Sequence, residues 1–178
     1  MFCKKVMVIG AGTMGSGIAQ VFLTHGCDVI LNDIKQEFID GGVKKIDKSL
    51  TKLVAKEKMT QADKDAAMGR LTGFVEITKD NMKDVDLVVE AAIEDMKIKG
   101  QKKKNLGEVC PPETILASNT SSLPITKIAA ATNRPDKVIG MHFFNPAPVM
   151  KLIELINGIA TSEDTFNKVF EASKALGK

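Results

Sequence analysis

A short apolar segment that runs into a glycine-rich turn constrains the fold of this chain more than any other feature of its sequence. Residues 5–9 predict a buried strand, the sequence GAGTMG follows directly, and residues 14–25 have the apolar spacing of a helix. In such a turn Gly10 permits the tight bend, Gly12 lets the backbone approach a pyrophosphate, and Gly15 lets the helix pack closely on the sheet. The helix N-terminus offers N–H groups and a positive dipole end to phosphates. The pattern therefore predicts a dinucleotide site.

A carboxylate after the second predicted strand bears on which dinucleotide this turn binds. Residues 28–32 predict that strand, and Asp33 follows it at the spacing of about 20 residues that is usual for a ribose ligand. A carboxylate there accepts hydrogen bonds from the adenine ribose and repels a 2′-phosphate, which favours NAD over NADP. Lys35 lies two residues after Asp33, and its positive charge keeps NADP as an alternative cofactor. The alternative to a dinucleotide site is that the glycine-rich segment is an ordinary turn, that Asp33 is an exposed acid, and that neither binds a ligand.

Strand-like and helix-like segments alternate along the rest of the chain. Strands are expected at 75–78, 87–91, 115–118, 138–142 and 152–156, and helices at 36–58, 95–109, 124–131 and 163–177, with a shorter helix capped by Thr60. The alternation predicts parallel βαβ units with right-handed crossovers. The expected fold is α/β: a Rossmann-type, doubly wound, mostly parallel sheet with an inserted helical hairpin. Residues 1–178 are expected to form one NAD-binding domain, cut just before a final strand.

Composition and charge exclude several classes of protein. The chain is 44% hydrophobic and 26% charged with a net charge of +3, which is ordinary for a globular protein and argues against a dedicated nucleic-acid binder. Three cysteines without a C-x-x-C motif favour a reducing compartment. No run of 18 apolar residues occurs, and the N-terminal apolar run is too short for a signal peptide. A cytoplasmic protein without nucleic-acid, membrane or metal partners is expected.

The segment GMHFFNPAPVM, residues 140–150, contains one of only two histidines. His142 falls at the carboxyl end of a predicted parallel strand, the edge that lines the ligand crevice in open α/β sheets. Its imidazole could take the proton of an alcohol as hydride leaves for a nicotinamide. Glu154, amid the apolar residues of KLIELI, could accept a hydrogen bond from that imidazole. Sequence spacing does not prove that they meet, so a satisfied strand-end histidine and an exposed acid remain alternatives.

Four segments together resemble the 3-hydroxyacyl-CoA dehydrogenases, and within them the short bacterial 3-hydroxybutyryl-CoA dehydrogenases of fatty acid and butyrate metabolism. They are GAGTMGSGIAQ, VVEAAIEDMKIK, ILASNTSSLPIT and GMHFFNPAPVMKLIELI, and the resemblance spans all 178 residues. It implies an NAD-dependent oxidoreductase that interconverts short-chain 3-hydroxyacyl-CoA and 3-oxoacyl-CoA. It also implies a second, mostly helical domain that closes the cleft and makes a homo-oligomer. Because that domain is missing here, little activity is expected of these residues alone.

The resemblance also implies roles for individual residues. His142 is implied to be the catalytic base, Glu154 its partner, and Ser121 a hydrogen-bond donor to the 3-oxygen of the substrate, where the plain alternative is a polar loop residue. The residues implied at the cofactor are Gly10, Gly12, Thr13, Met14, Gly15, Asp33, Glu94, Lys99, Asn119 and Asn145. Those implied at the acyl-CoA substrate are Ser49, Lys56, Ser121 and Asn145, and Lys99 is implied near either the cofactor or the acyl-CoA.

A row of lysines gains meaning from the same resemblance. Lys44, Lys48, Lys52 and Lys56 recur every four residues, so they are expected to share one face of a helix, and a basic face attracts the phosphates of coenzyme A. A solvated helix face is the alternative, and it is favoured for every member except Lys56.

Two other functions remain open. Lens lambda-crystallin resembles the same family, so a non-catalytic nucleotide-binding or structural protein is an alternative, although the intact set of His142, Glu154 and Ser121 argues against it. A dehydrogenase of free hydroxy acids is a weaker alternative, because it gives the lysine-rich helix no role.

Overall fold

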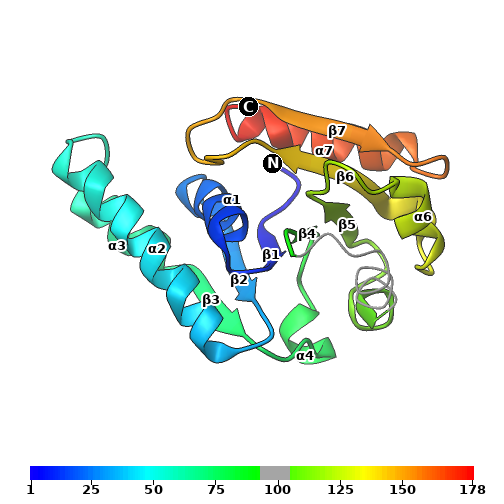
Figure 1. Ribbon diagram of the computed structural model, residues 1–178, viewed down its shortest axis with the longest axis horizontal. Helices are drawn as coiled ribbons and strands as arrows, with labels where there is room; N and C mark the ends of the chain where they lie inside the picture. The colour runs from blue at the N-terminus through cyan, green and yellow to red at the C-terminus, as the bar shows by residue number, and fades with distance from the viewer. Residues whose placement is uncertain (93–104) are drawn as a thin grey trace.

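A single sheet organises the computed structural model, which describes residues 1–92 and 105–178 (Figure 1). Its order is β3-β2-β1-β4-β5-β6-β7. The strands are β1 (Lys5–Ile9), β2 (Asp28–Asn32), β3 (Leu71–Phe74), β4 (Leu87–Glu90), β5 (Ile115–Ser118), β6 (Val138–Phe143) and β7 (Ile153–Asn157). Strands β1 to β6 are parallel, and only β7 pairs antiparallel, with β6. The expected doubly wound, mostly parallel sheet is confirmed.

Helices cover both faces of this sheet. They are α1 (Thr13–Thr24), α2 (Gln36–Ala55), α3 (Gln61–Gly69), α4 (Lys79–Met82), α6 (Ile125–Ala130), the 3₁₀ turn η1 (Pro135–Lys137) and α7 (Glu163–Ala175). Successive β1 residues point to opposite faces: Val6 and Val8 pack with α1, α2 and α7, whereas Met7 and Ile9 pack with α4 and α6. None of the helices in the described ranges combines the length and the apolar character that crossing a bilayer requires.

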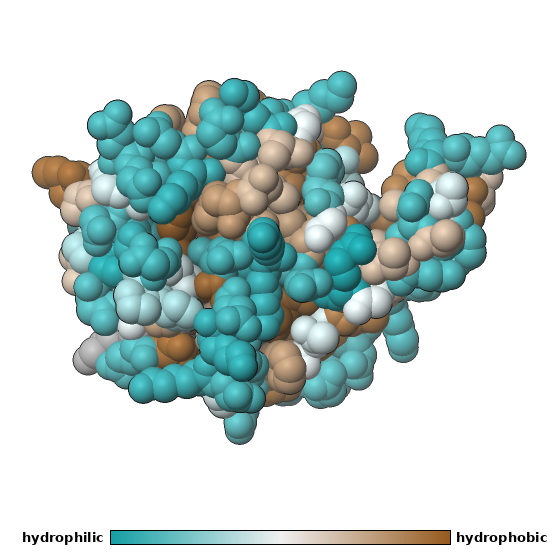
Figure 2. Space-filling model, turned by 180° about the vertical axis from the view of Figure 1, so that it is seen from behind, coloured by the Kyte–Doolittle hydropathy of each residue, from teal (hydrophilic) through white to brown (hydrophobic). Residues whose placement is uncertain are grey.

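The expected helical hairpin is formed by α2 and α3. Thr60 caps α3 by accepting a hydrogen bond from Asp63 N–H at 3.0 Å. Lys64 of α3 binds Asp47 of α2 at 2.9 Å and donates to Thr51 at 2.8 Å, which ties the helices together. In Figure 2 the hairpin projects from the body of the domain, and much of its visible surface is hydrophilic.

The prediction of a strand at residues 75–78 is wrong. The strand in this region is β3, Leu71–Phe74, which pairs with β2 in the register Val29↔Leu71. Gly73 lowers the strand propensity of this segment, but it lies under α2, where a Cβ would come within 2.5 Å of Ile39. Thr78 instead caps α4 in a reciprocal capping box with Asn81. Hydrogen-bonded pairing with β2 therefore decides where the strand forms, in spite of the higher strand propensity of the β-branched residues at 75–78.

Several predicted helices have bounds that differ from those in the structure, by at most three residues where both ends are described. The helix expected at 36–58 ends at Ala55, and Glu57 adopts a left-handed backbone with φ of 57°. The helix expected at 95–109 falls mostly outside the described residues, although 105–109 are helical.

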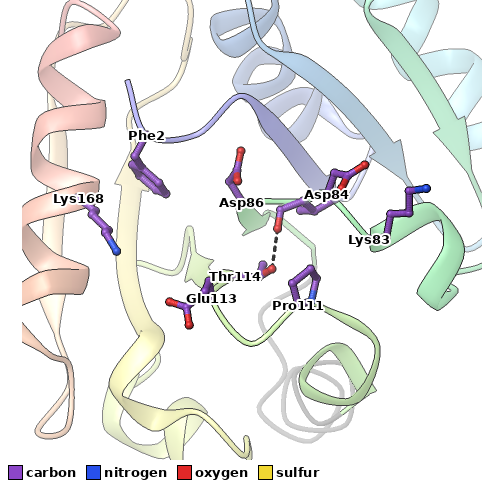
Figure 3. Close-up of a pocket in the computed structure, with 9 residues that line it drawn as sticks. Phe2, Lys83, Asp84, Asp86, Pro111, Glu113, Thr114 and Lys168 are labelled. Atoms are coloured by element: carbon purple, nitrogen blue, oxygen red, sulfur yellow. Dashed lines mark hydrogen bonds between the residues drawn. The ribbon is translucent and has the colours of Figure 1, made fainter.

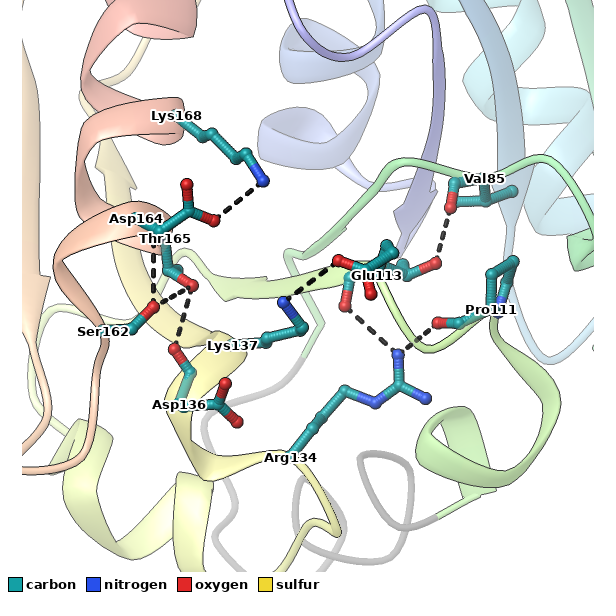
Figure 4. A network of polar contacts seen from close by, with 11 residues as sticks. Val85, Pro111, Glu113, Arg134, Asp136, Lys137, Ser162, Asp164, Thr165 and Lys168 are labelled. Carbon is teal, nitrogen blue, oxygen red and sulfur yellow. Dashed lines mark hydrogen bonds and ion pairs between the residues drawn. The ribbon is translucent and has the colours of Figure 1, made fainter.

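A buried arginine holds the segment that leads into β5 (Figure 4). Arg134 is 8% exposed, and its guanidinium donates to the carbonyls of Gly107, Cys110, Pro111 and Thr114. A cation at a helix C-terminus neutralises the negative dipole end and the unpaired carbonyls there. This contact steadies the chain before β5, whose carboxyl end carries Asn119 and Ser121.

Candidate cofactor site and active site

The glycine turn lies at the carboxyl end of β1 and brings helix and strand into close contact. Gly10 has φ of +102°, and a Cβ on Gly15 would fall 1.7 Å from the carbonyl oxygen of Gly10. Helix α1 begins after Gly12 with no side-chain cap and no acidic residue in its first turn. Its N–H groups and positive dipole end are therefore not neutralised by a neighbouring carboxylate of that turn.

Asp33 joins the end of β2 to this turn. Its carboxylate accepts from Ala11 N–H at 2.8 Å and from Ile34 N–H at 2.7 Å. A carboxylate has about four acceptor positions, so two remain for further donors such as ribose hydroxyls. The expected ligand of the ribose is thus held in place by backbone donors on both sides.

A hollow of about 220 Å³ separates the glycine turn from α2. A Cβ on Gly12 would meet nothing within 4 Å, so the backbone of Gly12 borders open space. The hollow is lined by Ala11, Gly12, Asp33, Glu37, Phe38, Gly41 and Lys45. These residues fit the adenosine and pyrophosphate part of a dinucleotide, because a carboxylate for ribose and a helix N-terminus for phosphate face the same space. Nζ of Lys35 lies 5.7 Å from the ring centroid of Phe38, which lines this hollow.

The histidine and the glutamate singled out in the sequence meet across β6 and β7. They are directly opposite each other in the antiparallel register, and Nδ1 of His142 lies 3.4 Å from Oε2 of Glu154. The His142 side chain is 18% exposed and that of Glu154 is 55% exposed. Contact through Nδ1 leaves Nε2 of the imidazole to face a substrate. The ring of Phe144 packs 4.7 Å from the imidazole.

A buried carboxylate connects the ends of β4 and β5. Glu90 has no exposed surface, and it accepts from Ala92 N–H at 3.0 Å and from the Ser118 hydroxyl at 3.4 Å. Asn119, the next residue, accepts from Phe143 N–H at 2.7 Å and so ties β5 to the residue after His142. Sequence reasoning missed Glu90; an acid at the end of the apolar run LVVE was the available signal.

The residues expected at the substrate are only partly brought together. Ser49 and Asn145 line one hollow of about 240 Å³, between α1, α2 and the loop after β6, and Thr13 lines it too. Lys56 caps the C-terminus of α2 and does not line this hollow, and Ser121 is exposed on the loop after β5.

Three further expectations concern residues near the cofactor. Met14, in the first turn of α1, is half-buried against the core. Glu94 and Lys99 lie outside the described residues.

The lysine that faces both hollows is Lys45, which sequence reasoning missed. The four lysines of the expected row are exposed on α2 and line neither hollow. Lys45 lies four residues after Gly41 and four before Ser49, so its spacing from Ser49 was the available signal.

A larger hollow, of about 510 Å³, lies at the amino-terminal edge of the sheet (Figure 3). Its lining includes Asp84, Asp86 and Glu113, and Asp86 accepts from Lys4 N–H at 2.7 Å and from Lys5 N–H at 3.1 Å. Ligands of open α/β sheets bind at the carboxyl ends of the strands. This hollow is therefore not the candidate cofactor site, in spite of its size.

The fold, the glycine turn and the placement of Asp33 define a dinucleotide-binding domain of the Rossmann type. The family described as 3-hydroxyacyl-CoA dehydrogenase, NAD binding domain, matches residues 5–178. The chain belongs to this family and corresponds to its NAD-binding domain.

Individual relatives agree with this assignment. The 3-hydroxybutyryl-CoA dehydrogenase of Clostridioides difficile is 52% identical over 98% of this chain and 61% of its own length. The probable 3-hydroxybutyryl-CoA dehydrogenase of Bacillus subtilis is 47% identical over 100% of this chain and 61% of its own length. The crystal structure of (S)-3-hydroxybutyryl-CoA dehydrogenase from Ralstonia eutropha superposes with a TM-score of 0.94, at 45% identity over 99% of this chain and 62% of that one. The chain thus spans about three fifths of the length of these relatives.

Proposed function

We propose that this chain forms the cofactor-binding part of a dehydrogenase that interconverts short-chain 3-hydroxyacyl-CoA and 3-oxoacyl-CoA, with 3-hydroxybutyryl-CoA and acetoacetyl-CoA as the pair. The observation that carries the proposal is the contact between His142 and Glu154 at the same sheet edge as the glycine turn. The names of the relatives supply the substrate class. We place the protein in the cytoplasm, in fatty acid and butyrate metabolism. We also propose that residues 1–178 form one domain and that the complete protein is a homo-oligomer.

The residues at this edge have distinct roles in the proposed reaction. Bound NAD supplies the acceptor for the hydride that leaves C3 of the hydroxyacyl group. Nε2 of His142 takes the proton from the 3-hydroxyl group and returns it in the reducing direction. Glu154 holds Nδ1–H, which keeps the imidazole in the required tautomer and stabilises the imidazolium. Ser121 donates a hydrogen bond to the 3-oxygen.

The remaining candidates bind and orient the two ligands. Asp33 holds the adenine ribose, and Glu37 in the same hollow adds a second negative charge that disfavours a 2′-phosphate. Ser49 and Lys56 are assigned to coenzyme A. The nicotinamide end of the cofactor is assigned to Asn119, Asn145, Glu94 and Lys99.

Titration with NADH and with NADPH tests the cofactor assignment directly. The chain has no Trp and no Tyr, so the fluorescence of the reduced cofactor is read against a low protein background. Tighter binding of NADH is expected because two carboxylates line the hollow. Equal or tighter binding of NADPH would contradict the role of Asp33 and turn attention to Lys35.

Replacement His142→Gln tests the catalytic assignment. We expect turnover of acetoacetyl-CoA with NADH to fall by roughly 10²–10⁴-fold, because general acid–base catalysis is lost, while the Kd for NADH stays unchanged. Turnover is best followed in a version extended by the part of the relatives' sequence that this chain does not span.

The matched control is His25→Gln, the same change at the other histidine. His25 caps α1 far from the glycine turn, and its ring binds the carbonyl of Val21 at 2.7 Å. A His142→Gln variant that turns over substrate as fast as this control would refute the proposed function.

A further inference from the structure

Lys45 occupies a position that neither the cofactor nor the substrate assignments above explain. It lies on α2 just before the buried Ile46, and it lines both the hollow with Gly12 and Asp33 and the hollow with Thr13 and Ser49. Gly12 and Thr13 are the N-cap and first residue of α1. Lys45 therefore shares each hollow with a residue at the start of α1.

The ammonium of Lys45 is not used in holding the fold together. Within residues 1–92 and 105–178 it makes no ion pair and no hydrogen bond, whereas Lys64 on the neighbouring helix binds both Asp47 and Thr51. A lysine that served the α2–α3 hairpin would have contacts like those of Lys64. Lys45 is exposed to solvent and lines both hollows, so its charge is available to a ligand that enters them.

A second positive feature meets Lys45 at the same place. The N-terminus of α1 has no side-chain cap and no acid in its first turn, and the backbone of Gly12 borders open space. A helix N-terminus and a full positive charge on one side of a hollow attract the same group, an anion with several acceptor oxygens. The carboxylates of Asp33 and Glu37 line the first hollow, whereas the second hollow is lined by no carboxylate of the described residues.

We propose that Lys45 is a phosphate-contacting residue for a ligand that binds beside the first turn of α1, in one of the two hollows that Lys45 lines. The ligand group is a phosphate or pyrophosphate, which both NAD and coenzyme A carry. The inference rests on the proposed function and adds to it a specificity-determining residue. Gly41 allows a ligand to reach Lys45 in the first hollow, since a Cβ there would meet nothing within 4 Å.

Binding measurements on Lys45→Gln test the proposal. The probes are NADH, followed by its fluorescence, and free coenzyme A, followed by calorimetry, each at two salt concentrations. Loss of a charge-assisted contact to phosphate is expected to raise the Kd of at least one probe by roughly tenfold and to weaken its salt dependence. A larger effect on NADH assigns the contact to the dinucleotide, and a larger effect on coenzyme A assigns it to the substrate.

Two variants with the same change of charge serve as controls. Lys44→Gln removes a charge from the neighbouring residue, which lines neither hollow, and reports the long-range field alone. Lys79→Gln removes an exposed charge from α4, on the other face of the sheet. Effects of Lys45→Gln on both probes no larger than those of Lys44→Gln would overturn the proposal. Failure of the unaltered chain to bind NADH would instead refute the proposed function, so the two failures are distinguishable.

Discussion

The glycine turn with Asp33 and the pair formed by His142 and Glu154 lie at the same edge of the sheet but are held in different ways. Asp33 receives two backbone N–H donors at 2.8 and 2.7 Å, and the turn is locked by the contact between Gly15 and Gly10. The His142–Glu154 contact is 3.4 Å long, it involves the edge strand β7, and one partner is 55% exposed. The cofactor region is therefore preorganised by backbone contacts, whereas the pair proposed for proton transfer depends on side chains that water reaches.

The largest expected effect is that of Gly15→Ala on the cofactor region. The new Cβ would lie 1.7 Å from a backbone oxygen, so α1 must move away from β1. We expect a loss of about 3 kcal/mol or more in the free energy of unfolding and a fall in Tm of roughly 10 °C, with NADH binding lost. Thermal unfolding followed by circular dichroism measures the change.

Gly12→Ala is the matched control for this prediction. Its Cβ points into open space in the free protein, so the Tm is expected to stay within about 2 °C of the original while NADH binding weakens. If both variants lost a similar amount of Tm, the close packing of α1 on β1 at Gly15 would not explain the loss in Gly15→Ala.

An intermediate effect is expected from Asp33→Asn, which tests how much of the preorganisation serves the cofactor. The amide keeps one acceptor for Ala11 N–H, but it loses the charge and an acceptor. The Kd for NADH is expected to rise by roughly tenfold, because hydrogen bonds to charged groups are the stronger ones, while the Kd for NADPH changes less. Parallel fluorescence titrations give both values, and an unchanged ratio of the two would contradict the assignment of Asp33 to the ribose.

The smallest expected effect on the fold is that of Glu154→Gln. An exposed pair contributes little to folding, so the free energy of unfolding should change by less than about 1 kcal/mol. Turnover in the extended version is expected to fall by roughly tenfold or more, since the imidazolium loses its counter-charge. Glu171→Gln, which removes the exposed partner of Lys174 on α7, controls for loss of a surface charge. A large loss of stability would mean that the pair is structural.

The two regions also differ in how far the sequence predicted them. The turn from Gly10 to Asp33 lies within one strand–helix–strand unit, where local geometry follows from local sequence, and the structure agrees with it. The pairing of His142 with Glu154 required the antiparallel register of β7, which the alternation of strands and helices did not specify. Asn119 was expected near the cofactor, yet its side chain also ties β5 to β6, a contact that spans 24 residues.

The sequence by itself determined the α/β alternation and the glycine turn, because periodicity and glycine positions act over a few residues. The family followed from the resemblance of four sequence segments, which the comparisons confirm. Tertiary structure decided the rest. Pairing with β2 placed the edge strand at Leu71–Phe74 rather than at 75–78, and burial of Glu90 between β4 and β5 gave an acid in an apolar run its partners. The rotation of α2 against α1 turned Lys45, and not the expected row of lysines, toward the two hollows. A helix turns about 100° per residue, so which face meets the ligand is settled only when the helix packs.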